Sequence, residues 1–320
     1  MTRRLSFWLG LPLALSSIIL FARCVPIPAS PLLGDEISDG SPAADDCIIA
    51  AGKRVPIGTR VVTWHEPSGF NAYRTGKHFD RSQGLDGKQR YGERPGRPDS
   101  LEELRASVHQ FVIHYDVCGT SRQCFKVLHD KRNLSVHFLL DVDGTIYQTL
   151  DIKERAWHAT VANDGAVGVE IAHPGAWRSP LNADMRRWYE RDQIGWRMKY
   201  PAWMRETGVR TEGYIPRPDR PDLIAGAVQG HEYHQFDFTS EQYAALARLI
   251  AGLNQALPRI HLAAPRDAAG AIIDRALPSA DLLAFDGVVG HFHVQTNKQD
   301  PGPAFQWERV LRDAAALRGR

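Results

Sequence analysis

The chain has 320 residues, of which 43% are hydrophobic, and a formal net charge of +2. A chain of this length and apolar content forms one large globular domain or two small ones, so general disorder is excluded. The near-neutral charge and the lack of a basic patch in the sequence give no reason to expect a nucleic-acid partner. We therefore expect a folded protein, and a monomer, that acts on a small molecule or a near-neutral polymer.

Residues 1–24 have the pattern of an export signal or a membrane anchor. Residues 1–4 are basic and residues 5–22 are almost wholly apolar, as in the charged start and apolar middle of a signal peptide. The run is just long enough to span a membrane, although it contains a glycine and a proline. We favour a signal that is cleaved, or lipidated at Cys24, so the protein is expected to be exported: periplasmic, membrane-anchored as a lipoprotein, or secreted.

Residues 25–99 are rich in Pro, Gly, Arg and Asp and contain only short strand-like patches. We interpret this segment as an N-terminal extension that wraps on a domain. Residues 95–98 mark a boundary, because Ser100 and Glu103 then have the pattern of a capping box that opens a short helix. The main domain is expected over residues 100–320.

The first half of this domain alternates between strand and helix patterns. Strand patterns occupy residues 111–114, 136–150 (two strands around an Asp-Gly turn) and 167–172, and a helix pattern occupies residues 121–131. In the last of these strands the alternation points Glu170 away from Val169 and Ile171. Gly168 leaves space beside the Glu170 carboxylate.

The second half begins with residues 174–234, which have no single period and carry four tryptophans. We interpret this segment as an insertion over the domain surface. Packing of its aromatic rings onto the domain is preferred to stacking on sugars. Thr239 with Gln242 then predicts a capped amphipathic helix, a strand is expected near Val288, and a helix over residues 304–317 closes the chain.

The segment from Gly290 to Trp307 carries the strongest chemical signal, because His291, Lys298 and Asp300 stand at fixed offsets beside a Pro-Gly-Pro corner. Together with His114, the histidine and the aspartate supply the three protein ligands of a catalytic zinc ion, which keeps one position for water. Such an ion would lower the pKa of its water to about 7 and polarise a carbonyl.

Amide hydrolysis also needs a base and an oxyanion donor. Glu170 suits the first role and Lys298 the second. Taken singly, His114 could be a satisfied core histidine, Asp300 a turn former and Lys298 a solvated charge. Glu170 could be a buried carboxylate paired with a cation. The joint offsets favour the catalytic interpretation.

Cys118 and Cys124 are the natural disulfide pair of an exported chain, because oxidising compartments join close thiols. The bridge would close a short loop just after His114. Two buried thiols are the alternative if the protein is not exported. Cys47 has no obvious partner.

Five motifs occur in the order found in type 2 N-acetylmuramoyl-L-alanine amidases, namely IHYD, SVHFLLDVDGTIYQ, RAWHAT, NDGAVGVEI and GHFHVQTNKQDPGPAFQW. From about Phe111 to Trp307 the sequence resembles this family of zinc amidases, which are related to peptidoglycan recognition proteins. The resemblance implies an α/β fold with a central mixed β-sheet flanked by helices and a zinc site in a surface groove. It also implies cleavage of the amide between N-acetylmuramic acid and L-Ala in peptidoglycan or a muropeptide.

The resemblance assigns roles to individual residues. It makes His114, His291 and Asp300 ligands of Zn²⁺, Glu170 the catalytic carboxylate, Lys298 the oxyanion stabiliser, and Trp157, His158 and Asn163 residues of the substrate groove. Many relatives have Tyr where this chain has Val136, which shifts proton transfer onto Glu170. His137 is then a groove residue or a core histidine.

Two other functions remain open at this stage. A peptidoglycan-binding module would hold a muropeptide without cutting it, and a zinc peptidase would act on a different amide. The complete ligand set, with Asp300 where many recognition proteins have Cys, favours catalysis.

Overall fold

The structure is a computed structural model that describes residues 45–75, 78–79 and 91–318. These residues all belong to one compact unit, residues 42–320. The expected export signal and Cys24 lie outside the described residues. Within the part of the chain that the structure describes, no helix is long and apolar enough to cross a membrane.

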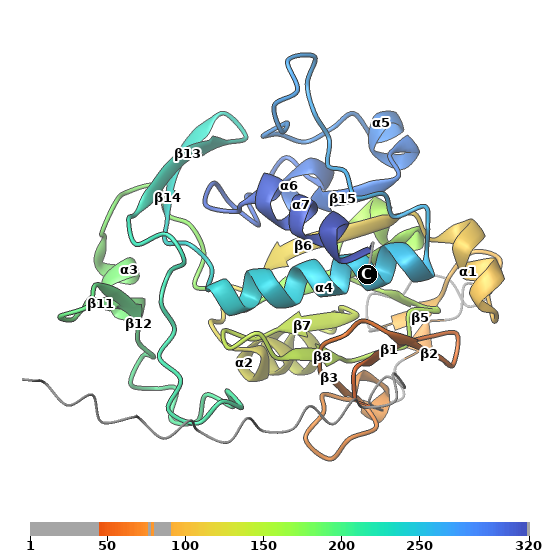
Figure 1. Cartoon of the computed structure of the whole chain (residues 1–320), viewed down its shortest axis with the longest axis horizontal. Helices are drawn as coiled ribbons and strands as arrows, with labels where there is room; N and C mark the ends of the chain where they lie inside the picture. Colours follow the sequence, from red (N-terminus) through yellow and green to blue (C-terminus); the bar gives the residue numbers. More distant parts are fainter. Residues whose placement is uncertain (1–44, 76–77, 80–90, 319–320) are drawn as a thin grey trace, which may run out of the picture. The chain divides into compact units, whose positions relative to one another are not determined.

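A mixed six-stranded β-sheet, in the order β15-β6-β10-β7-β8-β3, forms the centre of this unit (Figure 1). Its strands are β3 (Val61–Thr63), β6 (Gln110–Tyr115), β7 (Phe138–Leu140), β8 (Ile146–Gln148), β10 (Ala166–Ile171) and β15 (Gly287–Gly290). Strands β15, β6, β10 and β7 are parallel, β8 is antiparallel to β7, and β3 is parallel to β8. The mixed sheet flanked by helices that the family resemblance implied is confirmed.

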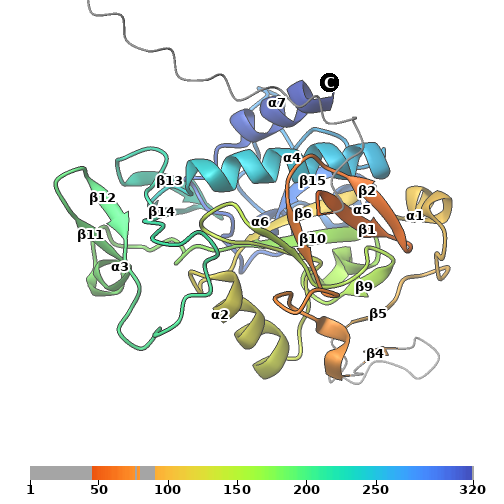
Figure 2. The same cartoon turned by 60° about the horizontal axis from the view of Figure 1, so that its bottom comes forward.

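Helices cover both faces of the sheet, as Figure 2 shows. On one face lie α4 (Ser240–Ala256) and α7 (Trp307–Arg318), and on the other lies α2 (Ser121–Phe125), which continues as a π-helix, η3 (Lys126–Lys131). The short helix α1 (Leu101–Ser107) precedes β6. The capping boxes expected before α1 and α4 are both present.

The alternation of side chains along β6 and β10 decides which residues reach the functional face. Phe111 and Ile113, with Val167 and Val169, pack into the main core with α4 and α7. Since successive side chains of a strand point to opposite faces, His114 and Glu170 point to the opposite face, toward α2.

Part of the expected N-terminal extension belongs to the sheet itself, because β3 is its edge strand next to β8. The hairpin β1 (Cys47–Ala50) and β2 (Lys53–Pro56) packs on the same core as α4. The short helix η1 (Ala72–Thr75) follows, and β4 (His78–Phe79), β5 (Tyr91–Glu93) and β9 (Glu154–Ala156) form a small separate sheet.

The segment expected to be an insertion forms two hairpins and one helix. They are α3 (Ala183–Trp188), β11 (Tyr189–Arg191), β12 (Trp196–Met198), β13 (Ile224–Val228) and β14 (His231–Gln235). Trp177, Trp188 and Trp196 pack against a hydrophobic cluster that includes Val142 and Ala172 of the domain. Trp203 instead is 60% exposed, so the packing expected for all four rings holds for three of them.

Candidate metal centre and active-site groove

Two neighbouring parallel strands place His114 and Glu170 side by side. The Cα atoms of these residues are register partners in the pairing of β6 with β10. Both side chains are buried, at 1% and 8% exposure, and both point away from the main core. The sheet therefore fixes the spacing between a candidate ligand and a candidate base without help from a loop.

His291 enters the site from β15, the neighbour of β6 on the other side. It is the first residue of α6 (His291–Val294), so the strand ends one residue earlier. Because His291 and His293 both lie in this helix, they do not share one side of a strand. His293 is fully buried, and its Nδ1 accepts a hydrogen bond from the backbone N–H of Gly290, so it is not a surface residue.

Two glutamine side chains of the β13–β14 hairpin hydrogen-bond to the backbone of the loop between His291 and Asp300 and of the residues that follow it. The side-chain amide of Gln229, in the turn between β13 and β14, donates to the carbonyls of Phe292, Gln295 and Lys298 at 2.8, 2.9 and 3.3 Å. The amide of Gln235 in β14 donates to the carbonyl of Pro301, and its oxygen accepts from Ala304 N. The insertion thus supports the loop that carries the third ligand.

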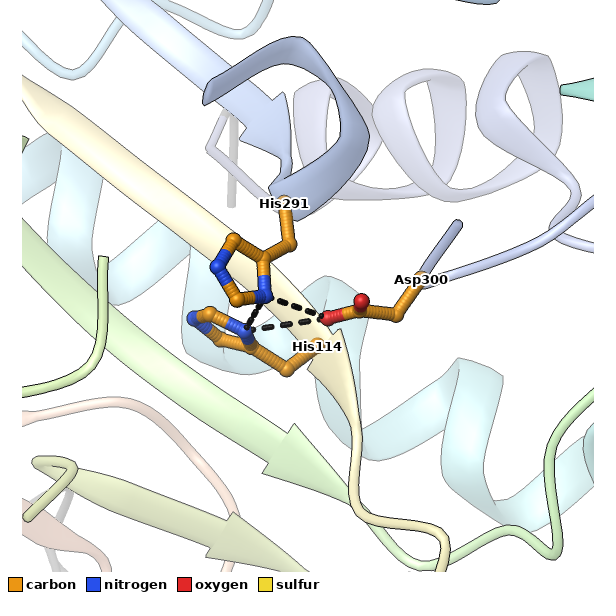
Figure 3. A group of neighbouring side chains, drawn as sticks. All are labelled: His114, His291 and Asp300. Atoms are coloured by element: carbon orange, nitrogen blue, oxygen red, sulfur yellow. Dashed lines mark hydrogen bonds and ion pairs between the residues drawn. The ribbon is translucent and has the colours of Figure 1, made fainter. Parts of the chain in front are cut away.

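Figure 3 shows the side chains of His114, His291 and Asp300 pointing at one another. The Nδ1 atoms of the two histidines are 2.9 Å apart, and they lie 3.1 and 2.9 Å from Oδ2 of Asp300. Ligand atoms about 2.1 Å from a tetrahedral zinc ion would be about 3.4 Å apart. Two imidazoles and one carboxylate at nearly this spacing can hold such an ion.

The electrostatics of the group suit metal binding, which needs neutral imidazoles and an ionised carboxylate. Burial, and then the neighbouring His291, lowers the pKa of His114 to about 4. Burial alone would raise the pKa of Asp300, but His291 and His114 outweigh it and hold that pKa well below its usual range. At neutral pH, His114 is therefore neutral and Asp300 is charged.

Two further side chains orient the imidazoles. With a metal ion on Nδ1 of each ring, Nε2 would carry the proton and act as a donor. His114 Nε2 lies 2.9 Å from Nδ1 of His158, and His291 Nε2 lies 2.9 Å from Oε1 of Gln295, so each would then have an acceptor. Gln295 was missed in the sequence, because it comes beside His291 only through the helical turn of α6, which the sequence did not predict.

Glu170 and Lys298 both line a cavity of about 240 Å³ beside this centre. Oε2 of Glu170 is buried and has no hydrogen-bond partner in the described part of the chain. Burial, and then the carboxylates of Asp300 and Asp116, raises the pKa of Glu170 well above its usual value, while Lys298 opposes this shift. A buried carboxyl group with a raised pKa is a candidate for proton transfer.

The residues expected in the substrate groove occupy different places. His158 lines the cavity. Asn163 is buried, and its side-chain oxygen accepts hydrogen bonds from the backbone N–H groups of His158 and Ala159, so it shapes the loop that carries His158. Trp157 is half-buried, with the guanidinium of Arg155 4.8 Å from its ring centre, and it does not line the cavity.

His137 has no exposed surface, which excludes the position in the substrate groove that the sequence left open. Its Nδ1 accepts from Gly168 N at 3.2 Å, and its Nε2 lies 2.9 Å from the carbonyl of Glu154. Burial, and then Arg94, lowers the pKa of His137 to about 3. The structure thus places this residue in the core.

Arg94 is a supporting residue that the sequence did not reveal. It is 1% exposed, and it donates to the carbonyls of Ile152, Asp164 and Ala166 at 3.0, 2.9 and 2.8 Å. These bonds hold the helix η4 (Thr160–Asp164), which follows the His158 loop. Nothing distinguishes Arg94 from the other arginines of its Arg-rich and Gly-rich segment.

The expected disulfide between Cys118 and Cys124 is not formed in the structure, where both residues are free thiols. Their side chains are joined by a hydrogen bond, which together with burial raises the pKa of Cys124 well above its usual value. The second alternative from the sequence, a pair of thiols, describes this arrangement, with Cys124 buried and Cys118 half-buried.

The fold and this site define an α/β protein with a candidate metal centre of the hydrolytic type. The family model described as N-acetylmuramoyl-L-alanine amidase matches residues 104–303. That is more than half of the chain, and the chain belongs to this family. No curated protein matches it.

Several solved structures resemble the chain. An AmpD selenomethionine derivative is 16% identical, with 73% of this chain and 96% of that chain covered and a TM-score of 0.34. AmiD from E. coli, described in complex with the substrate anhydro-N-acetylmuramic acid-L-Ala-D-gamma-Glu-L-Lys, is 18% identical, with 65% and 57% covered and a TM-score of 0.37. The endolysin LysCS from Clostridium intestinale URNW is 15% identical, with 66% and 86% covered and a TM-score of 0.34.

Proposed function

We propose that this protein is a zinc-dependent amidase that hydrolyses the bond between N-acetylmuramic acid and L-Ala in peptidoglycan or a muropeptide. The family model supports the reaction class. The observation that carries the proposal is the convergence of the ligand atoms of His114, His291 and Asp300 beside the unpartnered carboxyl oxygen of Glu170.

The chain's own residues divide the remaining work. When bound, a zinc ion supplies a Lewis acid that polarises the carbonyl and makes its water ligand more acidic. Glu170 takes the proton from the attacking water and later gives it to the leaving amine of L-Ala, so that a carboxylate and an amine are formed. Lys298 stabilises the negative charge that develops on the carbonyl oxygen.

The direct test is mass spectrometry of defined muropeptides incubated with the full chain. We expect release of a peptide with a free L-Ala amino terminus when zinc is present, loss of this product after chelation, and its return when zinc is restored. A muropeptide that binds to the zinc-loaded protein but stays intact would replace the amidase proposal with a recognition module. Cleavage at another amide would identify a zinc peptidase.

We also propose that the protein is exported, on the basis of the charged and apolar pattern of residues 1–24. Export would bring the enzyme to the compartment that contains its polymeric substrate. Fractionation of cells that express the full chain tests this, with a variant lacking residues 1–24 as the control. Recovery of both proteins in the cytosol would contradict export.

A further inference from the structure

A second hollow, of about 380 Å³, lies on the other flank of the helix that borders the active-site groove. The active-site groove is the cavity of about 240 Å³ beside the metal centre, and the continuous α2–η3 helix lines it with Cys124, Val127 and Leu128. The same helix lines the second hollow with Lys126 and Lys131. The opposite wall comes from residues 203–206 of the insertion. We call this hollow the Trp203 groove.

The indole of Trp203 is held in place yet open to solvent. Its ring lies edge-on against Trp188, with centroids 6.2 Å apart and an interplanar angle of 87°. The next residue, Met204, is buried, and its N–H donates to the carbonyl of Pro201. Because this ring is already held in place, it would lose little side-chain entropy when a ligand binds. Its exposed apolar face can stack on the flat face of a sugar.

The surroundings of Trp203 are basic. The exposed side chains of Lys126, Lys131 and Arg205 make no hydrogen bond or ion pair with any residue that the structure describes. Arg122 is different, because it pairs with Glu206 at 2.7 Å and so joins α2 to the insertion. Three uncompensated cations around an aromatic platform favour a ligand that combines sugar rings with carboxylates.

We propose that the Trp203 groove binds polymeric peptidoglycan at a site separate from the metal centre, with a sugar ring of the glycan strand on Trp203 and carboxylates of the stem peptides beside the lysines. This inference rests on the proposed amidase function and narrows it, because it makes the polymer the preferred substrate. Since one helix separates the two hollows, a strand held in the groove raises the local concentration of stem peptides near the metal centre.

The first experiment measures binding without cleavage. Chelated full-length protein is sedimented with purified sacculi, and the bound fraction is measured as the amount of sacculi rises. We expect Trp203→Ala and the double variant Lys126→Ala/Lys131→Ala each to bind about tenfold more weakly. The matched controls are Ile194→Ala, an insertion side chain that is 80% exposed outside the groove, and Lys53→Ala in β2; both should bind like the unmodified protein.

The second experiment compares zinc-loaded turnover of sacculi with turnover of a soluble muropeptide. We expect the ratio of the two rates to fall about tenfold in Trp203→Ala and to stay constant in Ile194→Ala. An unchanged ratio together with unchanged sedimentation would overturn the groove proposal. If no variant cuts either substrate, the amidase proposal fails, while sedimentation still decides whether the groove binds the polymer.

A membrane is the competing occupant, because exposed tryptophan and lysine side chains also suit an anionic lipid surface. Sedimentation is therefore repeated with vesicles of phosphatidylglycerol and phosphatidylethanolamine in equal parts. If the groove variants lose vesicle binding but keep sacculus binding, the groove is a lipid-binding surface and the peptidoglycan proposal is wrong. Loss of sacculus binding alone supports it.

Discussion

The ring of His158 lies between the metal centre and Gly168. Its Nδ1 is 2.9 Å from Nε2 of His114, and a Cβ atom added to Gly168 would lie 2.5 Å from its Cε1. A ligand histidine is thus oriented by a second histidine, whose own position depends on a residue without a side chain. Such outer partners commonly change metal affinity 10–100-fold when they are lost.

We expect Gly168→Ala to weaken zinc binding by about 10–100-fold, because the new methyl group displaces His158 from His114. Competition with a chromophoric zinc chelator measures the affinity. Gly165→Ala is a matched control, since its Cβ would lie 2.3 Å from Cε1 of His109, a histidine outside the site. Equal losses in the two variants would mean that general strain, rather than His158, is responsible.

We expect Glu170→Gln to reduce amide hydrolysis by about 10²–10⁴-fold, because glutamine cannot take the proton of the attacking water. Glu170 is not in the ligand group, so zinc affinity should change little. Single-turnover cleavage of a soluble muropeptide and zinc titration of the same sample separate the two effects. Full activity in the variant would remove Glu170 from the proposed mechanism.

We expect Arg94→Gln to lower the free energy of unfolding by about 3 kcal/mol or more, because buried carbonyls lose charge-assisted hydrogen bonds. Urea unfolding gives the size of the loss, and hydrogen exchange should show it near η4. Arg97→Gln is the control, since Arg97 is 63% exposed in its ion pair with Glu93, and should cost less than about 1 kcal/mol. If both variants lower the free energy of unfolding by a similar small amount, Arg94 does not support the fold as proposed.

The contribution of Asp141 to the stability of the protein should fall as the pH rises from about 4 to 8. Burial raises the pKa of this carboxyl group from 3.8 to about 8, so in this window the folded protein keeps a proton that the unfolded chain has released. The contribution of Asp141 is complete below about pH 4 and is lost by about pH 8.

Asp141→Asn removes this titration, so the difference in stability between the variant and the unmodified protein should grow in favour of the variant as the pH rises. We expect the variant to be more stable than the unmodified protein at pH 8 by about 1 kcal/mol or more, with a much smaller difference near pH 4. Urea unfolding at both pH values measures this, with the exposed Asp222→Asn as a control that keeps the original slope. Parallel profiles for both variants would refute the assignment.

Features that depend on neighbours in the sequence could be predicted. Both capping boxes involve residues three positions apart, and they formed as expected. The alternation along β10 correctly pointed Glu170 away from Val169 and Ile171, because side chains of a strand alternate between two faces. The strand expected near Val288 is present, but the helix that begins at His291 was not predicted, since the boundary of a short element depends on packing.

The supports of the site could not be predicted, because they depend on contacts between distant parts of the chain. Arg94 reaches the carbonyl of Ala166 across 72 residues, and Gln229 reaches Phe292 across 63. No local pattern marks one arginine or one glutamine for such a bond. The burial of His137 could not be predicted from the sequence either, because a histidine can lie in a substrate groove or in a core.

The reactive groups of the site can be identified from the sequence: a His, a Lys and an Asp at fixed offsets in one segment, a second His at the end of an apolar run, and a carboxylate on a strand. Their arrangement around one centre depends on the fold. Parallel pairing of β6 with β10 and β15 brings His114 beside Glu170 and His291, because hydrogen bonds between strands fix the register. Burial then shifts the pKa values of His114 and Glu170. Burial is a property of the folded chain, so these shifts could not be predicted from the sequence.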